Sequence, residues 1–305
     1  MKVFVAGAGG AIGKPLVRAL IAAGHQVIGM ATRTAGVQAL RDQGAVAVLL
    51  NALDTDAVSR EIARFRPDAV IDELTSLPGR YTADEMRTAA PRDRHVRLEG
   101  GGNLYRAALQ SGVGRYMVQS TGFFYGPGAG LAEETEPLAH AASPGVAGAV
   151  ATYTRIEARL FSDSRLEGVA LRYGFFYGPR TYYDLDTGSI AQDVREGRYP
   201  LVEPGTGVYS FIHIEDAASA TVAALETPPG VYNVVDDNPT PIAVWLPVFA
   251  RFIGAPDPPR VAAEEAVRQN GPDAAYYALR LRGASNAKAK ETFRFAPRPL
   301  EWLAG

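Results

Sequence analysis

The first residues of the chain combine an apolar segment, a turn with four glycines and a helical pattern in an order suited to binding phosphates. Residues 2–6 are apolar like a buried strand, and residues 15–21 have a helical pattern. A turn that opens on a helix N-terminus offers free backbone N–H groups and the positive end of the helix dipole to a pyrophosphate. A purely structural glycine turn is the alternative, since glycine serves any tight turn. We expect a dinucleotide to be held by Gly7, Gly10, Ala11, Ile12 and Gly13.

The residues that end the second expected strand, 25–32, indicate which coenzyme binds. An Asp or Glu there would accept hydrogen bonds from the adenosine ribose and repel a 2′-phosphate, but residues 30–34 contain no carboxylate. Arg33 offers a bidentate contact to a phosphate, and Thr32 adds a hydroxyl donor. We therefore expect NADP, with NAD as the less favoured coenzyme; an ordinary solvated Arg33 is the structural alternative. Four residues past the third and fourth expected strands should line the adenosine: Asn51, Ala52, Leu74 and Thr75.

A parallel sheet is needed to bring these residues to one edge. Short apolar segments alternate with helical patterns up to residue 120, the longest pattern being a helix over 85–110 that Pro91 should bend. Such alternation predicts an α/β fold, a Rossmann-type doubly wound parallel sheet with helices on both faces. Ligands of such sheets bind at the carboxyl ends of the strands.

The later part of the chain is less regular. Residues 121–145 are rich in Gly and Pro and predict a long loop beside the site, and a helix over 147–163 follows. We expect residues 1–180 to form the dinucleotide-binding domain, with residues 213–235 returning to it. Residues 181–305 should form mostly a smaller C-terminal substrate lobe.

Composition excludes several function classes. The 305 residues carry a net charge of -2, which gives no reason to expect nucleic acid or a membrane surface as a partner. The chain has no cysteine, so thiolate nucleophiles, disulfides and zinc–thiolate sites are excluded. The acidic run Glu133, Glu134 and Glu136 lacks a histidine partner, and no metal site is expected. The chain begins directly with a strand and has no apolar run of ~18 residues, so we expect a cytoplasmic protein.

Five segments in chain order resemble the extended and atypical branch of the short-chain dehydrogenase/reductase superfamily, the NAD-dependent epimerase/dehydratase group. They are the glycine loop 7–13, the strand-end segment 119–126, and the segments 171–179, 211–218 and 285–290. The resemblance implies a bound nicotinamide coenzyme and hydride chemistry on an alcohol or carbonyl carbon. It also implies coenzyme contacts from Gln119, Ser120 and Tyr173, and a homodimer.

In the family site a Tyr exchanges a proton with the reacting oxygen, a Lys four residues later lowers the pKa of that Tyr, and a Ser or Thr positions the oxygen. Thr121 matches the Ser or Thr role. The Tyr–Lys pair has no match, because Tyr153 is followed at that spacing by Glu157. In a second alignment, which the distance from Glu157 to Arg172 favours, Tyr153 takes the Lys position and Ala149 the Tyr position.

The absent cation has a consequence for the chemistry. A tyrosine without a nearby cation keeps a pKa near ~10, which makes it a poor base but a usable acid. We therefore name Thr121 and Tyr153 as catalytic candidates in a site that favours reduction; packing in the coenzyme cleft is the alternative for Tyr153. The expected substrate-binding residues are Phe123, Phe124, Tyr177 and Tyr182.

The sequence thus predicts an NADP-dependent oxidoreductase acting on a small carbonyl or hydroxyl compound. Aromatic side chains suit an apolar or aromatic substrate, or a sugar stacked on a ring. Two alternatives stay open. One is a redox-neutral epimerase or dehydratase acting on a sugar-like substrate, and the other is a non-catalytic NADP-binding sensor.

Overall fold

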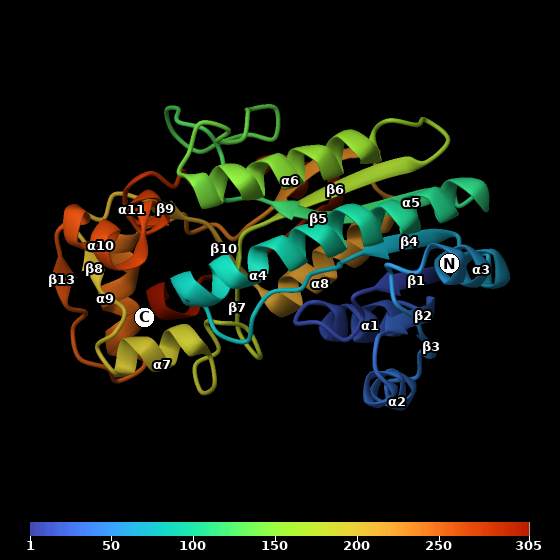
Figure 1. Cartoon of the computed structure of the whole chain (residues 1–305), viewed down its shortest axis with the longest axis horizontal. Helices are drawn as coiled ribbons and strands as arrows, with labels where there is room; N and C mark the ends of the chain where they lie inside the picture. Colours follow the sequence, from blue (N-terminus) through green and yellow to red (C-terminus); the bar gives the residue numbers. More distant parts are fainter. Residues whose placement is uncertain (305) are drawn as a thin grey trace.

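The structure, a computed structural model, describes residues 1–304 and builds them around one parallel sheet (Figure 1). The sheet has seven strands in the order β11-β6-β5-β4-β1-β2-β3. These strands are β1 (Lys2–Ala6), β2 (Gln26–Ala31), β3 (Val46–Leu49), β4 (Ala69–Asp72), β5 (Arg115–Thr121), β6 (Glu167–Tyr173) and β11 (Gly230–Val234). Strand order reverses at β1, which pairs with both β2 and β4. The doubly wound fold is confirmed, and it puts the crevice for a ligand at the carboxyl ends of β1 and β4.

Helices cover both faces of the sheet because each strand is apolar on both sides. One face packs against α1 (Gly13–Ala22), α2 (Thr34–Asp42), α8 (Ile214–Ala223) and α12 (Ala287–Phe293). The other face packs against α3 (Thr55–Phe65), α5 (Gly101–Gln110) and α6 (Pro144–Leu160). No helix within residues 1–304 has both the length and the apolar character to cross a membrane.

The long helix expected over 85–110 is divided by a change in its hydrogen-bond pattern. Figure 1 shows α4 (Ala83–His95) running on into α5. Between them lies one π-helical turn, η1 (Val96–Gly100). Pro91 lies inside α4, so the proline does not end the helix. A π turn inserts a residue relative to the α-helical register and rotates the side chains around it.

The C-terminal lobe is made of short elements around an aromatic core, and Figure 1 shows its later helices in orange on the side opposite β3. Its helices are α7 (Ser189–Arg195), α9 (Ile242–Phe252), α10 (Ala263–Asn270) and α11 (Pro272–Leu279). Its short strands are β7 (Phe175–Tyr177), β8 (Leu201–Val202), β9 (Val208–Tyr209), β10 (Phe211–His213), β12 (Thr240–Pro241) and β13 (Arg260–Val261). The short 3-10 turns are η2 (Ala224–Glu226) and η3 (Glu301–Leu303). Phe211, Trp245 and Phe249 lie fully buried at the centre of the lobe.

A buried ion pair ties α6 to the sheet. Arg172 of β6 donates from Nε to Oε1 of Glu157 at 2.8 Å and from Nη2 to Oε2 at 2.7 Å. Arg172 also donates to the Tyr125 hydroxyl at 2.9 Å, and Tyr125 donates to Asn233 at 2.6 Å. The network therefore joins α6, β6, β11 and the 121–145 segment.

Removing one partner of this pair should destabilise the fold strongly. We expect Glu157→Ala to lower the free energy of unfolding by about 3–5 kcal/mol, because Arg172 would remain buried without its counter-charge. Urea-induced unfolding measures the change. The exposed Arg165–Asp163 pair supplies the control, and Arg165→Ala should leave the unfolding midpoint almost unchanged. Equal losses in both variants would contradict the structural role of the buried pair.

Candidate functional site

The glycine loop leaves a backbone cradle that side chains would fill. Gly7 has a φ of 79°, and a Cβ there would meet the backbone carbonyl of Glu73, with the carbonyl carbon at 2.7 Å. A Cβ on Gly13 would overlap the Gly7 oxygen and lie 2.6 Å from the Ala8 carbonyl carbon. Ile12, the N-cap residue of α1, makes no side-chain cap. Because no side chain caps the helix and Gly10 and Ala11 are exposed, the amides at this turn suit a diphosphate.

The residues expected at the adenosine end lie at the carboxyl ends of β2 and β3. Thr32 and Arg33 are exposed after β2, and the Arg33 side chain has no ion-pair partner among residues 1–304. Asn51 is exposed and its side-chain oxygen accepts a hydrogen bond from the Leu53 amide at 3.1 Å. Ala52 is buried beneath Gly100. The geometry leaves Arg33 available to a phosphate.

The end of β4 carries a buried carboxyl group that the sequence analysis missed. Leu74 is buried and Thr75 exposed there, as expected of residues lining a wall, but Glu73 just before them is only 4% exposed. One carboxyl oxygen of Glu73 lies 3.1 Å from the Tyr173 hydroxyl, and the other is buried without a partner. The sequence feature that could have revealed this carboxyl group is the pair of consecutive acids Asp72 and Glu73 at the end of an apolar strand.

Burial favours the protonated form of Glu73. The Tyr173 hydroxyl donates to Glu73, lies 2.6 Å from the Thr221 hydroxyl, and Thr221 donates to the Ala217 carbonyl at 2.7 Å. Burial, the largest cause, raises the pKa of Glu73 to about 8, and the hydrogen bond from Tyr173 opposes that rise. The neutral carboxyl group therefore predominates at pH 7.

The end of β5 presents the catalytic candidate Thr121 and two expected coenzyme contacts, Gln119 and Ser120. Thr121 is 1% exposed, and its hydroxyl oxygen is buried with no hydrogen-bond partner. Ser120 instead donates to Glu157 at 2.6 Å, which ties its side chain to the structural ion pair. Gln119 lies beside Arg97, with its side-chain oxygen 3.5 Å from Nη1 of that residue. Thr121 is therefore the side chain of the three whose hydrogen bonding is left for a ligand.

Tyr153 lies in α6 with a cation over its ring. The Arg97 guanidinium carbon is 5.1 Å from the ring centroid, a cation–π arrangement. Burial raises the pKa of the Tyr153 phenol, and Arg97 opposes that rise. The phenol is therefore neutral at physiological pH. Glu157, four residues after Tyr153, is paired with Arg172 and so is not free to take part in the site.

Aromatic rings gather where the sheet meets the C-terminal lobe. Phe123 stacks on Phe175 at 4.1 Å between ring centroids, and Phe175 stacks on Tyr209 at 4.8 Å. Tyr277 of α11 lies 5.8 Å from Phe124. Tyr182 also joins this group, because its ring lies 5.2 Å from that of Tyr81. The aromatic cluster is therefore defined as Tyr81, Phe123, Phe124, Phe175, Tyr182, Tyr209 and Tyr277.

Two of the expected ligand-binding tyrosines already use their hydroxyls within the protein. Tyr177 is 1% exposed, donates to the Pro299 carbonyl at 3.3 Å and packs against Trp302 at 5.0 Å between centroids. Tyr173 is also 1% exposed and joins the Glu73 chain. The structure thus places Tyr177 in the lobe core and Tyr173 below the glycine loop.

The acidic run of the 121–145 segment also has structural partners. Glu136 accepts hydrogen bonds from Arg282, one of them at 2.9 Å. The side chain of Glu134 accepts a hydrogen bond from the Asn233 amide at 2.8 Å. Glu136 thus fastens the segment to Arg282, and Glu134 fastens it to β11 of the sheet.

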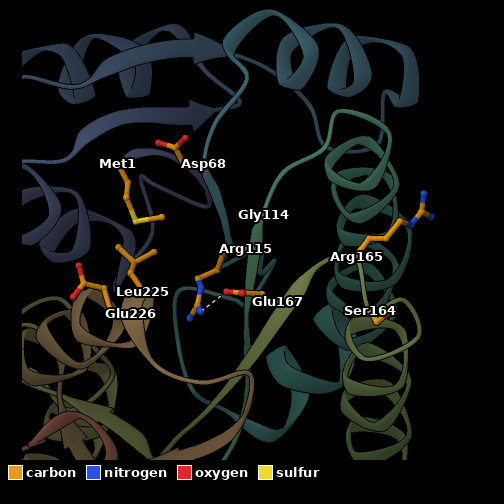
Figure 2. Close-up of a pocket in the computed structure, with 9 residues that line it drawn as sticks. All are labelled: Met1, Asp68, Gly114, Arg115, Ser164, Arg165, Glu167, Leu225 and Glu226. Carbon is orange, nitrogen blue, oxygen red and sulfur yellow. Dashed lines mark hydrogen bonds and ion pairs between the residues drawn. The ribbon is translucent and has the colours of Figure 1, made fainter.

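A separate hollow of about 510 Å³ opens at the other end of the sheet (Figure 2). Its lining residues Asp68 and Gly114 precede β4 and β5, so the hollow lies at the amino ends of the strands. Arg115 points into this region, but it donates to Glu167 at 2.7 Å and to the carbonyls of Ala224 and Thr227 at 3.0 and 2.8 Å. The hollow is therefore distinct from the coenzyme site, which parallel sheets form at the carboxyl ends.

Comparisons with known proteins agree with this geometry. The profile described as "NAD dependent epimerase/dehydratase family" matches residues 3–234. A Streptomyces sp. protein, 3-diazoavenalumate denitrifying reductase, is 40% identical over 308 residues, covering 100% of this chain and 99% of its own length.

Solved structures share the fold. UDP-glucose 4-epimerase of Thermotoga maritima with UDP-glucose superposes with a TM-score of 0.77 at 21% identity, over 99% of this chain and 95% of its own. The UDP-glucose 4-epimerase of Thermus thermophilus in complex with NAD has a TM-score of 0.72 at 26% identity, over 98% and 94%.

The protonated Glu73 makes stability depend on pH. Its folded-state pKa of about 8 lies above the unfolded value of 4.5, so the folded state holds the extra proton and is destabilised as pH rises between these values. The loss approaches about 1.4 kcal/mol per pH unit. We expect Glu73→Gln, which retains a hydrogen-bond donor, to flatten the decline in urea-unfolding free energy from about pH 5 to about pH 8.

Asp236 titrates in the same direction, since burial raises its pKa to about 7, so some decline remains in the variant. Asp236→Asn alone should leave the Glu73 contribution in place. Identical pH profiles for wild type and Glu73→Gln would show that Glu73 is ionised in the folded protein.

Proposed function

The chain belongs to the NAD dependent epimerase/dehydratase family, and from that premise we propose that it is an NADP-dependent reductase of a flat, electrophilic aromatic compound. Enzymes among its relatives confirm the expectation of an NAD(P)-dependent oxidoreductase or epimerase over that of a non-catalytic sensor. The direction, coenzyme preference and substrate class are our proposal.

The coenzyme is held by two features of the chain. The amides of the glycine loop take the diphosphate, because Gly7 and Gly13 leave the space that a Cβ would fill. Arg33, exposed after β2, takes the 2′-phosphate with Thr32 beside it. When bound, the coenzyme supplies a hydride.

The observation that carries the reductive assignment is the replacement of the proton-exchanging pair. Ala149 has no ionisable group, and Tyr153 is a neutral phenol whose pKa burial raises further. Oxidation of an alcohol needs a base to take the hydroxyl proton, and neither residue provides one at neutral pH. A reaction that uses hydride alone needs no such base.

Reductive removal of a diazonium group is such a reaction. Replacing the N₂⁺ group of an arene by hydride forms one C–H bond and breaks one C–N bond. The electron pair of the hydride goes to the ring carbon, N₂ leaves, and no proton is taken up or released. The 40% identical reductase, named for removing nitrogen from a diazo compound, supports this substrate class. Within the aromatic cluster, the half-buried rings that a flat substrate could reach include Phe123, Tyr182 and Tyr277.

Carbonyl reduction is the second candidate, and Thr121 favours it. Its buried, unpartnered hydroxyl can donate a hydrogen bond to a carbonyl oxygen near the nicotinamide. The product alkoxide would then need a proton from the solvent or from the neutral Tyr153.

Isotope transfer separates these reactions. NADPH carrying deuterium at C4 is incubated with a substituted arenediazonium salt or with an aromatic ketone. We expect deuterium at the arene carbon that lost nitrogen, N₂ release equal to NADPH consumed, and no deuterium from D₂O. Turnover of the ketone alone would favour the second candidate. Turnover of a UDP-sugar with no net change in NADPH would overturn both in favour of epimerisation.

Coenzyme choice is tested at Arg33. We expect Arg33→Ala to weaken NADPH binding about 10- to 100-fold, because a charge-assisted bidentate contact to the 2′-phosphate is lost. NADH binding should change little, since that coenzyme lacks the phosphate. Fluorescence titration of both reduced coenzymes measures the two affinities. Arg41→Ala, at the far end of α2, is the matched control, and equal losses for NADPH and NADH would contradict the phosphate role.

A further inference from the structure

A buried arginine faces the site from an element that carries none of the residues expected from sequence. Arg97 lies in the π turn η1, and its side chain is 4% exposed. Its Nε donates to Asp93, one turn earlier, at 2.7 Å. The Arg97 and Leu98 carbonyls accept hydrogen bonds from Arg159 of α6 at 3.3 and 2.7 Å. These bonds hold the turn, so the direction of the guanidinium is fixed.

The guanidinium of Arg97 retains hydrogen-bonding capacity. Nη1 reaches Gln119 only at the long distance of 3.5 Å, and Nη2 has no hydrogen-bond partner among residues 1–304. An arginine guanidinium carries donors on all three nitrogens, and Nη2 is not among the fully buried atoms that lack a partner, so solvent reaches it. The group lines a narrow hollow together with Asp72, Leu74 and Gln119, in which a water molecule does not fit. A ligand oxygen that bonds to Arg97 in this hollow must therefore displace one of these side chains.

The position of Arg97 in the sheet indicates which half of the coenzyme it meets. Leu74 follows β4 and Gln119 lies near the end of β5, so the hollow is on the β4–β5 side of the glycine loop. Arg33 follows β2, on the other side of β1. A dinucleotide that crosses the loop at its diphosphate therefore has its adenosine near Arg33 and its nicotinamide half near Arg97.

We infer that Arg97 binds the nicotinamide half of the coenzyme and brings to this site the positive charge that α6 does not provide. Its Nη groups donate to oxygens of that half, while the Tyr153 ring packs against the guanidinium. Arg97 is thus a binding and positioning residue. The inference rests on the proposed function only in requiring that a nicotinamide coenzyme binds.

The test compares a whole coenzyme with its adenosine half. Binding of NADPH and of the fragment 2′,5′-ADP is measured by calorimetry for the wild type, Arg97→Gln and Arg97→Lys. We expect Arg97→Gln to weaken NADPH about 10- to 100-fold and to leave 2′,5′-ADP unchanged, because the fragment lacks the half that Arg97 contacts. Arg97→Lys should recover part of the NADPH affinity, since it restores the charge without the fork of donors.

The controls separate a coenzyme contact from a structural role. Arg94→Gln removes an exposed charge from the same helix and should leave both affinities unchanged. Arg97→Gln leaves the Asp93 carboxylate without its ion-pair partner. If this variant does not fold, the double variant Arg97→Gln/Asp93→Asn is measured in its place. Equal weakening of NADPH and 2′,5′-ADP, or unchanged NADPH affinity in a folded variant, would overturn the inference. A wild type that binds neither ligand would instead refute the proposed coenzyme.

Discussion

Close approach of three backbone segments at the glycine loop sets the position of everything else in the site. Gly13 at the start of α1 lies against the Gly7 carbonyl, and Gly7 lies against the backbone of Glu73. Neither position can carry a side chain without moving β1, α1 and β4 apart. The same approach puts the Glu73 side chain under the loop, where the hydrogen bond from Tyr173 links it to Thr221 of α8. A buried acid next to a phosphate site is tolerable because it is uncharged, whereas an ionised carboxylate would repel the diphosphate.

Charge is distributed around this loop in a way that fits reduction better than oxidation. Arg33 lies beyond β2 without an ion-pair partner among residues 1–304, Arg97 lies beside β4 and β5 in an ion pair with Asp93, and burial favours the neutral form of Glu73. In the proposed alignment the helix α6 contributes a neutral phenol and a methyl group, and its acid Glu157 is paired with Arg172. This distribution of charge suits the proposed reductase.

Sequence reasoning reached the features that depend on local order and failed where side-chain direction depends on packing. The order of the glycine loop between β1 and α1 and the alternation of strands and helices follow from spacing along the chain. Arg97 was not among the expected residues, and its direction is set by a π turn that a period of 3.6 residues does not predict. Tyr177 resembled a site residue by its strand-end position, yet the lobe core encloses it, and that core is built from contacts distant in sequence.

The paired charges Arg97 and Asp93 belong to one helix and lie four residues apart. The distance between the cation and its counter-ion therefore does not depend on how the two lobes are oriented. A change confined to this one helical turn would therefore alter the charge beside Tyr153 and leave the glycine loop and the aromatic cluster as they are. Diversification within such a scaffold needs no new fold, only a different side chain at an inserted helical position.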